Sequence, residues 1–299
     1  MAKQSIEKLP DHIAAKLSCL EEIRVKHRNF EYALMKIEER RLVGLGMNKP
    51  SNLLILGESG AGKTTLSEEI VSMHQSRRIR TDGILKIPVI YCKVPAQASP
   101  LSVAREIMRA LIKDFDPGGN LDRLTNSIIK LIRTCEVELI LIDEVQELAE
   151  GRSYNPVRKA ANWLKQLNER ASTPLIFLGT GEAIELLSIN EQLERRVAEA
   201  IDLADYDPSN PDDLSAFRNI LLEIERQLPF EKPSNLADPD IARGLMKSSR
   251  GLIGRLVDFL KDAGVVAISN NRKCITKSDL RETFARRIQS KEPNTKNPF

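Results

Sequence analysis

The chain has 299 residues, of which 41% are apolar and 29% are charged, a composition typical of a globular protein with one or two domains. Only 4% are aromatic, which argues against a β-sandwich and against an aromatic surface that stacks bases. The net charge of +3 is too small to indicate nucleic-acid binding by itself, so a basic surface would have to come from local clustering.

The first 50 residues are charged and mostly helical in pattern, and "GMNKPSN" ends this helical segment. From Asn52 onward, apolar strands alternate with helices. Such alternation predicts an α/β fold, in which a parallel five-stranded sheet is flanked by helices on both faces. The predicted strands are Leu53–Leu56, Ile87–Val94, Glu138–Ile142, Pro174–Leu178 and Ala200–Leu203. The predicted helices are Thr64–Gln75, Pro100–Asp114, Leu121–Thr134 and Pro156–Arg170.

The pattern changes again near "DYDPSNPDD", after which we find helical stretches and no convincing strand. These helices are Leu214–Gln227, Pro239–Ser248, Leu252–Asn270 and Lys277–Ile288. We therefore expect an N-terminal helical segment (1–50), an α/β domain (51–206), a C-terminal all-helical domain (207–289) and a flexible tail (290–299).

A phosphate-binding loop follows the first strand. "GESGAGKT" fits the pattern G-x-x-x-x-G-K-[ST] and stands between a strand and a helix, as the motif requires. Lys63 is expected to contact the β- and γ-phosphates, and Thr64 is expected to bind Mg²⁺. The sequence therefore predicts ATP and Mg²⁺ as cofactors. The predicted nucleotide-binding residues of this loop are Gly57, Glu58, Ser59, Gly60, Ala61, Gly62, Lys63, Thr64 and Thr65.

Two carboxylates, Asp143 and Glu144, end the strand in "ELILIDEVQEL". Ligands bind at this end of the strands in an open parallel sheet. Asp143 is expected to bind Mg²⁺, and Glu144 is expected to orient and activate the attacking water. Two carboxylates in a strand-end turn would be unremarkable alone, but the phosphate-binding loop favours the catalytic interpretation.

The acidic pair, a strand ending in "IFLGT", the downstream "LERR" and the helical second domain together resemble an AAA+ ATPase. The resemblance implies that Thr180 senses the γ-phosphate and that Arg255, in "GLIGRL", contacts phosphate from a helical lid. It also implies that Arg195 or Arg196 reaches the nucleotide of a neighbouring subunit, and the sequence does not choose between them. Each assignment has a structural alternative. Thr180 could lie in an ordinary strand-end turn, Arg255 at an exposed helix start, and Arg195 and Arg196 at a solvated helix end.

More closely, the order of "LILIDEVQEL", "LGTGEA", "NEQLERRV" and "GLIGRL" is similar to transposition-regulator ATPases of the TniB/TnsC type, over residues 25–290. This resemblance implies an ATPase of the bacterial cytosol that forms a homo-oligomeric ring or filament on double-stranded DNA. Such a protein selects target DNA and recruits or activates a transposase, with a further targeting protein as an optional partner, and ATP hydrolysis times its disassembly.

Other classes remain open on the sequence. Helicase loaders, origin-binding ATPases and secretion-type adaptor ATPases share most of these motifs. A P-loop kinase of small molecules fits less well, because it usually lacks a helical lid with an arginine. A secretion adaptor would need a membrane anchor, and no apolar run approaches the ~20 residues that span a bilayer.

Arg105, Arg109 and Lys113 recur every four residues along the predicted helix that begins at Pro100. They therefore share one helical face, which could follow a DNA phosphate backbone without reading bases. A solvated surface face would show the same pattern, so both interpretations stay open.

The four cysteines, Cys19, Cys92, Cys135 and Cys274, are widely spaced and form no CxxC pair. This spacing favours reduced thiols over disulfides or a zinc site. The N-terminus has no signal-peptide pattern, so we expect a cytoplasmic protein without membrane contact.

Overall fold

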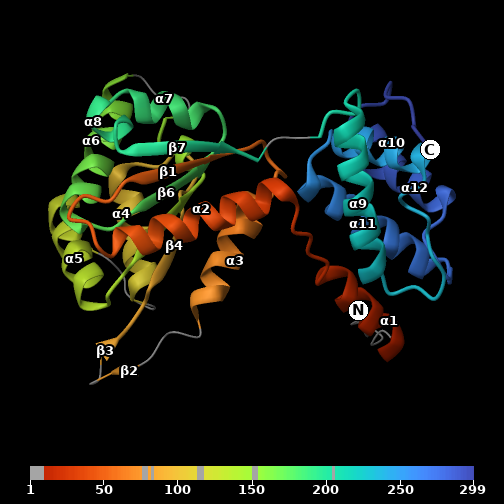
Figure 1. The fold of residues 1–299 in the computed structure, drawn as a ribbon, viewed down its shortest axis with the longest axis horizontal. Helices are drawn as coiled ribbons and strands as arrows, with labels where there is room; N and C mark the ends of the chain where they lie inside the picture. Colours follow the sequence, from red (N-terminus) through yellow and green to blue (C-terminus); the bar gives the residue numbers. More distant parts are fainter. Residues whose placement is uncertain (1–9, 76–79, 82–83, 113–117, 150–153, 204–205) are drawn as a thin grey trace, which may run out of the picture. The chain divides into compact units, whose positions relative to one another are not determined.

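The computed structural model describes residues 10–75, 80–81, 84–112, 118–149, 154–203 and 206–299 (Figure 1). Two compact units make up the chain: an α/β unit, Arg28–Ala204, and a helical unit, Met1–His27 with Asp205–Phe299. The segment 1–50, expected to be one piece, is divided between them, because α1 (Asp11–Glu21) lies in the helical unit and α2 (Arg28–Gly44) lies in the α/β unit. Periodicity identifies the apolar face of a helix but not the core that this face meets.

The α/β unit contains a five-stranded sheet with the order β4-β5-β6-β1-β7. All its strand pairs are parallel, which confirms the predicted fold class. Branched apolar residues fill the central strands, and helices cover both faces of such a sheet. The strands are β1 (Asn52–Leu56), β4 (Val89–Lys93), β5 (Leu139–Asp143), β6 (Leu175–Gly179) and β7 (Val197–Asp202).

The helices of this unit are α2, α3 (Lys63–Gln75), α4 (Pro100–Leu111), α5 (Leu121–Thr134), α6 (Tyr154–Ala171), α7 (Glu182–Ser188) and α8 (Glu191–Glu194). A capping box between Ser99 and Ser102, with Pro100 in the first turn, starts α4 where the sequence predicts it. Ile112 is extended, so α4 ends before the predicted Asp114, which lies outside the described residues. Sequence periodicity missed α7, α8 and a small antiparallel pair, β2 (Arg80–Thr81) and β3 (Ile84–Leu85), because each is shorter than the pattern needs.

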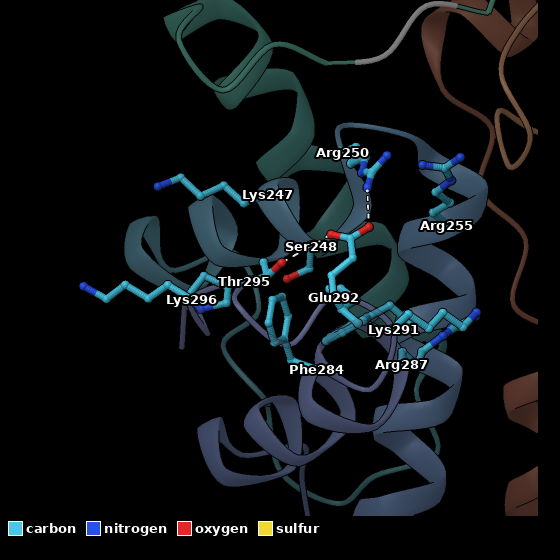
Figure 2. Close-up of a pocket in the computed structure, with 13 residues that line it drawn as sticks. Lys247, Ser248, Arg250, Arg255, Phe284, Arg287, Lys291, Glu292, Thr295 and Lys296 are labelled. Atoms are coloured by element: carbon cyan, nitrogen blue, oxygen red, sulfur yellow. Dashed lines mark hydrogen bonds and ion pairs between the residues drawn. The ribbon is translucent and has the colours of Figure 1, made fainter.

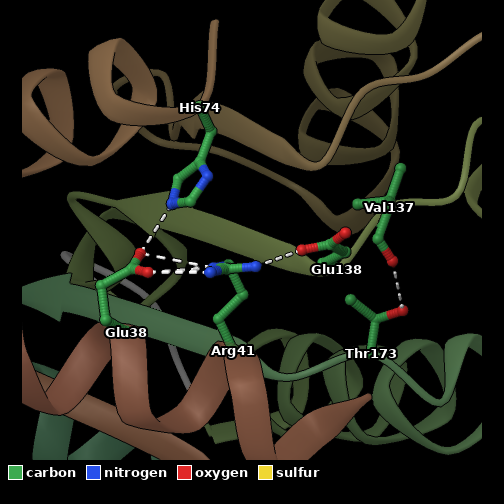
Figure 3. Close-up of polar contacts among 6 residues, drawn as sticks. All are labelled: Glu38, Arg41, His74, Val137, Glu138 and Thr173. Atoms are coloured by element: carbon green, nitrogen blue, oxygen red, sulfur yellow. Dashed lines mark hydrogen bonds and ion pairs between the residues drawn. The ribbon is translucent and has the colours of Figure 1, made fainter. Parts of the chain in front are cut away.

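A buried arginine attaches α2 to the rest of the α/β unit (Figure 3). Arg41 is 4% exposed and forms ion pairs with Glu38 at 2.9 Å and with Glu138, next to β5. Glu38 also lies 2.7 Å from Nε2 of His74 on α3. Close by, Thr173 donates a hydrogen bond to the carbonyl of Val137 at 3.3 Å. The charged side chains of Glu38 and Arg41 therefore fix α2 to α3 and to the residue before β5.

The helical unit comprises α1, α9 (Pro211–Gln227), α10 (Pro239–Ser249), α11 (Ile253–Ser269) and α12 (Lys277–Phe284), and a π-helical turn, η2 (Ala285–Gln289), continues α12. The predicted all-helical character is confirmed. Phe217, Leu256 and Leu260 are completely buried in its core. Gly264 allows α1 to approach α11 closely, because a Cβ there would lie 2.8 Å from the side chain of Leu20. None of the described helices is both long enough and apolar enough to cross a membrane.

The end of the chain packs on this unit, which differs from the expected flexible tail. The ring of Phe299 stacks on Phe259 with centroids 5.9 Å apart, and its edge meets Phe284 at 6.3 Å. Arg281 donates a hydrogen bond to the carbonyl of Phe299 at 2.7 Å. Polar composition and prolines pointed to disorder, but the Phe299 ring and the hydrogen bonds of Asn297 and Phe299 with Arg281 hold the segment.

Candidate nucleotide-binding site

The predicted phosphate-binding loop connects the end of β1 to the start of α3. Gly60 and Gly62 have φ angles of 90° and 100°, which favour glycine, and a Cβ on Gly57 would lie 2.8 Å from that of Ala61. The N-terminus of α3 offers unsatisfied backbone N–H groups and a positive dipole end, which together favour an anion. The Lys63 ammonium is buried against the loop and donates hydrogen bonds to the carbonyls of Gly57 at 2.7 Å and Glu58 at 3.3 Å.

Asp143 ends β5 and is completely buried. Its carboxylate accepts hydrogen bonds from the Thr64 hydroxyl at 3.2 Å, the Tyr91 hydroxyl at 2.9 Å and the Glu144 N–H at 2.9 Å. Burial, together with the Asp143 charge, raises the pKa of Tyr91, so its hydroxyl stays a donor. The fold thus brings the two predicted Mg²⁺ ligands, Thr64 and Asp143, into contact.

These two residues suit Mg²⁺. A hydroxyl and a carboxylate are hard oxygen ligands, and Mg²⁺ in ATP sites takes its other ligands from phosphates and water. Asp143 and Thr64 already lie within hydrogen-bond distance, at the edge where the phosphate-binding loop emerges. The donor set of this site therefore fits the predicted metal.

Gln146 joins the predicted catalytic Glu144 to the Thr180 loop. Glu144 has a left-handed backbone (φ 56°), immediately before the 3₁₀ turn η1 (Val145–Leu148). The Gln146 amide nitrogen donates to the Glu144 carboxylate at 2.6 Å, and its oxygen accepts from the Thr180 N–H at 3.3 Å. A carboxylate only accepts and a backbone N–H only donates, so the orientation of this amide follows from its neighbours. Gly179 leaves room for it, since a Cβ there would lie 2.6 Å from the amide oxygen.

Tyr91 and Gln146 were not predicted from the sequence. Tyr91 comes from β4, where the parallel register pairs it with Leu141 of β5, two residues before Asp143, and its hydroxyl reaches the Asp143 carboxylate. Gln146 follows Glu144 by two residues. A polar residue so close to the predicted catalytic carboxylate could have been recognised from the sequence as part of the site. The predicted sensor Thr180 follows β6, and its hydroxyl donates to Glu182 at 2.6 Å.

The two adjacent arginines after α8 have different surroundings. Arg196 has a side chain 19% exposed, donates to Asn168 at 2.8 Å and pairs with Glu169 at 3.3 Å. Arg195 is 78% exposed and pairs only with the equally exposed Glu191 among the described residues, at 3.3 Å. The backbone carbonyl of Arg196 accepts from Asn52 N–H, so both arginines lie at the start of β1, whereas the phosphate-binding loop follows its end.

The remaining predicted residues belong to other elements of the chain. Arg105 and Arg109 lie on α4, and Arg109 pairs with Glu106 on the same helix. Lys113 lies outside the described residues. Arg255 belongs to α11 of the helical unit, and its contact with nucleotide remains a prediction.

Comparisons with known proteins agree with this architecture. A family model described as "Bacterial TniB protein" matches residues 22–206. The ORC1-type DNA replication protein 2 of Thermoplasma acidophilum is 22% identical over 92% of this chain, and a Cenarchaeum symbiosum relative is 24% identical over 90%. The chain spans 66% and 64% of the lengths of these relatives, just under two thirds.

Solved structures show the same fold. The Aeropyrum pernix ORC1 protein in complex with DNA has a TM-score of 0.66, with 18% identity over 90% of this chain and 69% of that chain. The Pyrobaculum aerophilum Cdc6p structure has a TM-score of 0.62, with 15% identity over 90% of this chain and 70% of that chain. These likenesses concern the fold, which is that of AAA+ proteins. Because the family match covers more than half of the sequence, including the phosphate-binding loop and the acidic pair, the chain belongs to the TniB family.

Proposed function

We propose that this protein is a Mg²⁺-dependent ATPase that assembles on double-stranded DNA and recruits or activates a transposase. Hydrolysis of ATP times the disassembly of the oligomer. Membership of the TniB family and the geometry around Glu144 support this proposal. The bacterial cytosol is the compartment that such a role requires.

The side chains divide the chemistry between them. Lys63 and the loop that ends at Gly62 bind the β- and γ-phosphates, which places the γ-phosphorus for in-line attack. Asp143 and Thr64 would hold Mg²⁺, which when bound offsets the charge of the phosphate oxygens. Glu144 orients a water and accepts its proton, while Thr180 donates to the γ-phosphate.

The position of Arg195 is the observation that carries the assembly part of the proposal. Strand β1 separates Arg195 from the phosphate-binding loop of its own chain, a span of about 13 Å at the usual rise per residue. Its guanidinium is exposed, whereas Arg196 is held by Asn168 and Glu169. An arginine so placed serves the site of a neighbouring subunit better than its own. We therefore assign the trans-acting role to Arg195.

Two observations support double-stranded DNA as a partner: membership of the TniB family and the basic face of α4. One ORC1 structure of this fold was solved in complex with DNA. On α4, Arg105 and Arg109 share one face and could contact phosphates, although Arg109 is partly neutralised by Glu106. For Arg255 on α11 of the helical unit, we propose the contact with nucleotide phosphates that the sequence resemblance implies.

Sedimentation velocity tests the proposal directly. Wild-type protein should sediment as an oligomer only when ATP, Mg²⁺ and double-stranded DNA are present together. Glu144→Gln should keep this oligomer and stop turnover, because the amide still hydrogen-bonds but cannot accept the proton. Lys63→Ala on its own should bind no nucleotide, because the phosphate charge is then unmatched in the loop, and should form no oligomer with itself, because none of its interfaces would hold ATP.

Glu147→Gln is the matched control, because it removes a carboxylate from the same turn, three residues from Glu144. It should hydrolyse ATP at the wild-type rate. An oligomer that forms equally well without ATP, or a wild-type protein that does not sediment differently with DNA under any condition, would contradict the proposal. If the protein assembles but does not stimulate a cognate transposase, the proposed ATPase activity stands and the proposed recruitment of a transposase is wrong.

A further inference from the structure

The helical unit has a hollow of about 530 Å³ with a strongly basic lining (Figure 2). Its walls come from the end of α10, the start of α11, α12 with η2 and the last residues of the chain. One carboxylate, Glu292, lies among six cationic side chains. These are Lys247, Arg250, Arg255, Arg287, Lys291 and Lys296.

Only part of this positive charge is compensated. Glu292 pairs with Arg250 at 3.0 Å, and Asp262 lies 3.2 Å from a guanidinium nitrogen of Arg287. No carboxylate of the described residues forms an ion pair with the ammonium groups of Lys247, Lys291 and Lys296. Those three lysines are exposed, and they stand on both sides of Glu292 in Figure 2. The whole chain carries a net charge of only +3, so this hollow concentrates positive charge well beyond the average of the molecule.

The chemistry of the hollow favours phosphate groups over an acidic peptide. Grooves that bind helical or proline-rich peptides offer exposed apolar or aromatic anchoring positions. Here Phe259 and Phe284 are 3% and 2% exposed, so their rings are not available for contact. The strongly exposed large apolar residues of this unit, Leu222 and Val265, do not line the hollow. The other apolar side chains of the lining, Ile288 and Pro298, are half-buried, and neither is aromatic. The flexible ammonium groups are suited to a chain of phosphates, which they contact as point charges.

We propose that this basic hollow of the helical unit binds the phosphate backbone of DNA, independently of base sequence. The inference rests on the proposed function, from which it takes double-stranded DNA as the ligand. It adds a second DNA contact to the one expected from α4, on the other compact unit. Lys247, Lys291 and Lys296 carry the contact, and Glu292 weakens it.

The test compares the full-length wild type with a variant carrying Lys247→Ala, Lys291→Ala and Lys296→Ala. Its matched control carries Lys232→Ala, Arg243→Ala and Lys277→Ala, which remove three exposed cations of the same unit outside the hollow. Fluorescence anisotropy gives the affinity for two duplexes of unrelated sequence at several salt concentrations. The hollow variant should lose about two to three units from the slope of log affinity against log salt, equally for both duplexes. The control should keep the wild-type slope.

Glu292→Gln gives a prediction of opposite sign from the same hollow. It removes the carboxylate and releases Arg250, so DNA should bind more tightly and the salt slope should steepen by about one unit. This conservative change also keeps the proposal testable if the triple variant folds poorly. Arg255 is left intact in every variant, so the proposed nucleotide contact is not altered.

Two further titrations distinguish DNA from other anions. Labelled ATP should bind the triple variant as it binds the wild type, because the phosphate-binding loop is intact. A labelled poly-glutamate peptide should bind the wild type more weakly than DNA does. Loss of ATP affinity with unchanged DNA binding, or preference for poly-glutamate, would overturn the assignment to DNA.

Failure of the two proposals can be told apart. If the wild type does not bind DNA, the proposed function and the basic hollow both fail. If the wild type binds DNA but the triple variant and Glu292→Gln both keep its salt slope, only the hollow is excluded.

Discussion

Gln146 is the residue whose contacts connect the predicted catalytic carboxylate, Glu144, to the predicted phosphate sensor, Thr180. It is 6% exposed and bridges Glu144 to the backbone N–H of Thr180. A base acts only when it points at the water, and small misplacements in a site are costly. Gln146→Leu keeps a similar volume without either hydrogen bond. It should lower kcat about 10- to 100-fold while the Kd for ATP stays near the wild-type value.

Two glycines provide an independent check on this prediction. Gly179→Ala should reproduce the kinetic defect, because its Cβ would lie 2.6 Å from the Gln146 amide oxygen. Gly181→Ala is the control, since a Cβ there meets no atom within 4 Å. Steady-state hydrolysis and ATP titration of the three variants give the comparison. A parallel loss of ATP affinity in Gln146→Leu would indicate a general structural role instead.

At the residue scale, the sequence predicts those parts of the site that are consecutive in the chain. Lys63 and Thr64 belong to a local motif, and Asp143 and Glu144 end one strand, so pattern and context were sufficient. Tyr91 could not be found in this way, since it reaches Asp143 only through the pairing of two strands. The choice between Arg195 and Arg196 also depends on neighbours distant in sequence, Asn168 and Glu169.

Among the elements, the segment between α1 and α2 contains a buried histidine that should make the helical unit sensitive to acid. Burial lowers the pKa of His27 from 6.5 to about 4, and its ring lies 6.0 Å from that of Tyr206. The unfolded chain takes up a proton near pH 6.5, whereas the folded chain does so only near pH 4. Neutral His27 therefore makes its whole contribution to the free energy of unfolding above pH 6.5. This contribution, about 3 kcal/mol, is lost as the pH falls from 6.5 to 4.

Urea unfolding at a series of pH values measures this effect. His27→Phe removes the titrating group. The urea midpoint measured by far-UV circular dichroism should then depend less on pH between 6.5 and 4. Trp163, the single tryptophan, lies in the α/β unit, so its fluorescence follows the other unit within the same sample. His12→Gln changes an exposed histidine of the helical unit and should leave the wild-type pH dependence in place. An unchanged dependence in His27→Phe would rule out His27 as its source.

Helix α4 carries the DNA contact expected from the sequence. Replacing Arg105, Arg109 and Lys113 by alanine should weaken binding to unrelated duplexes equally and reduce the salt slope by about one unit per lost contact. Because Arg109 already pairs with Glu106, its share should be smaller than that of an unpaired cation, and Glu106→Gln should steepen the slope. The test is the DNA affinity of wild type and variant at several salt concentrations. Unchanged ATP binding is the control that the nucleotide site is intact. If the slope is unchanged in a folded variant, this face of α4 is exposed to solvent and does not contact DNA.

Element boundaries could be predicted where apolar runs are long and caps are present, as at Ser99 before α4 and in the branched runs of β1, β5 and β6. The short helices α7 and α8 and the pair β2–β3 gave no periodic pattern long enough to identify. The packing of Phe299 was also missed, because one aromatic side chain is a tertiary feature that composition does not contain.

In the whole molecule, alternation of strands and helices was enough to predict the parallel sheet and the helical second unit. It could not show that α1 joins the C-terminal helices, since this depends on which core covers each apolar face. Leu20 packs beside Gly264, more than two hundred residues away in the chain. The proposed assembly follows the same principle, because Arg195 of one chain would complete the site of another.

A mixing experiment tests whether Arg195 acts in trans. Arg195→Ala should bind ATP but lose turnover by roughly 10³-fold or more, as expected for an arginine that stabilises phosphoryl transfer. Mixing it with Lys63→Ala subunits should restore hydrolysis at mixed interfaces, where the intact loop of one subunit meets the Arg195 of the other. Arg196→Ala is the control, because that side chain is tied to Asn168 and Glu169 within its own unit. It should lower the thermal midpoint and retain turnover per folded subunit. Hydrolysis that no mixing ratio restores would show that the active site is complete within one chain, and the exposed position of Arg195 would then have to serve another contact.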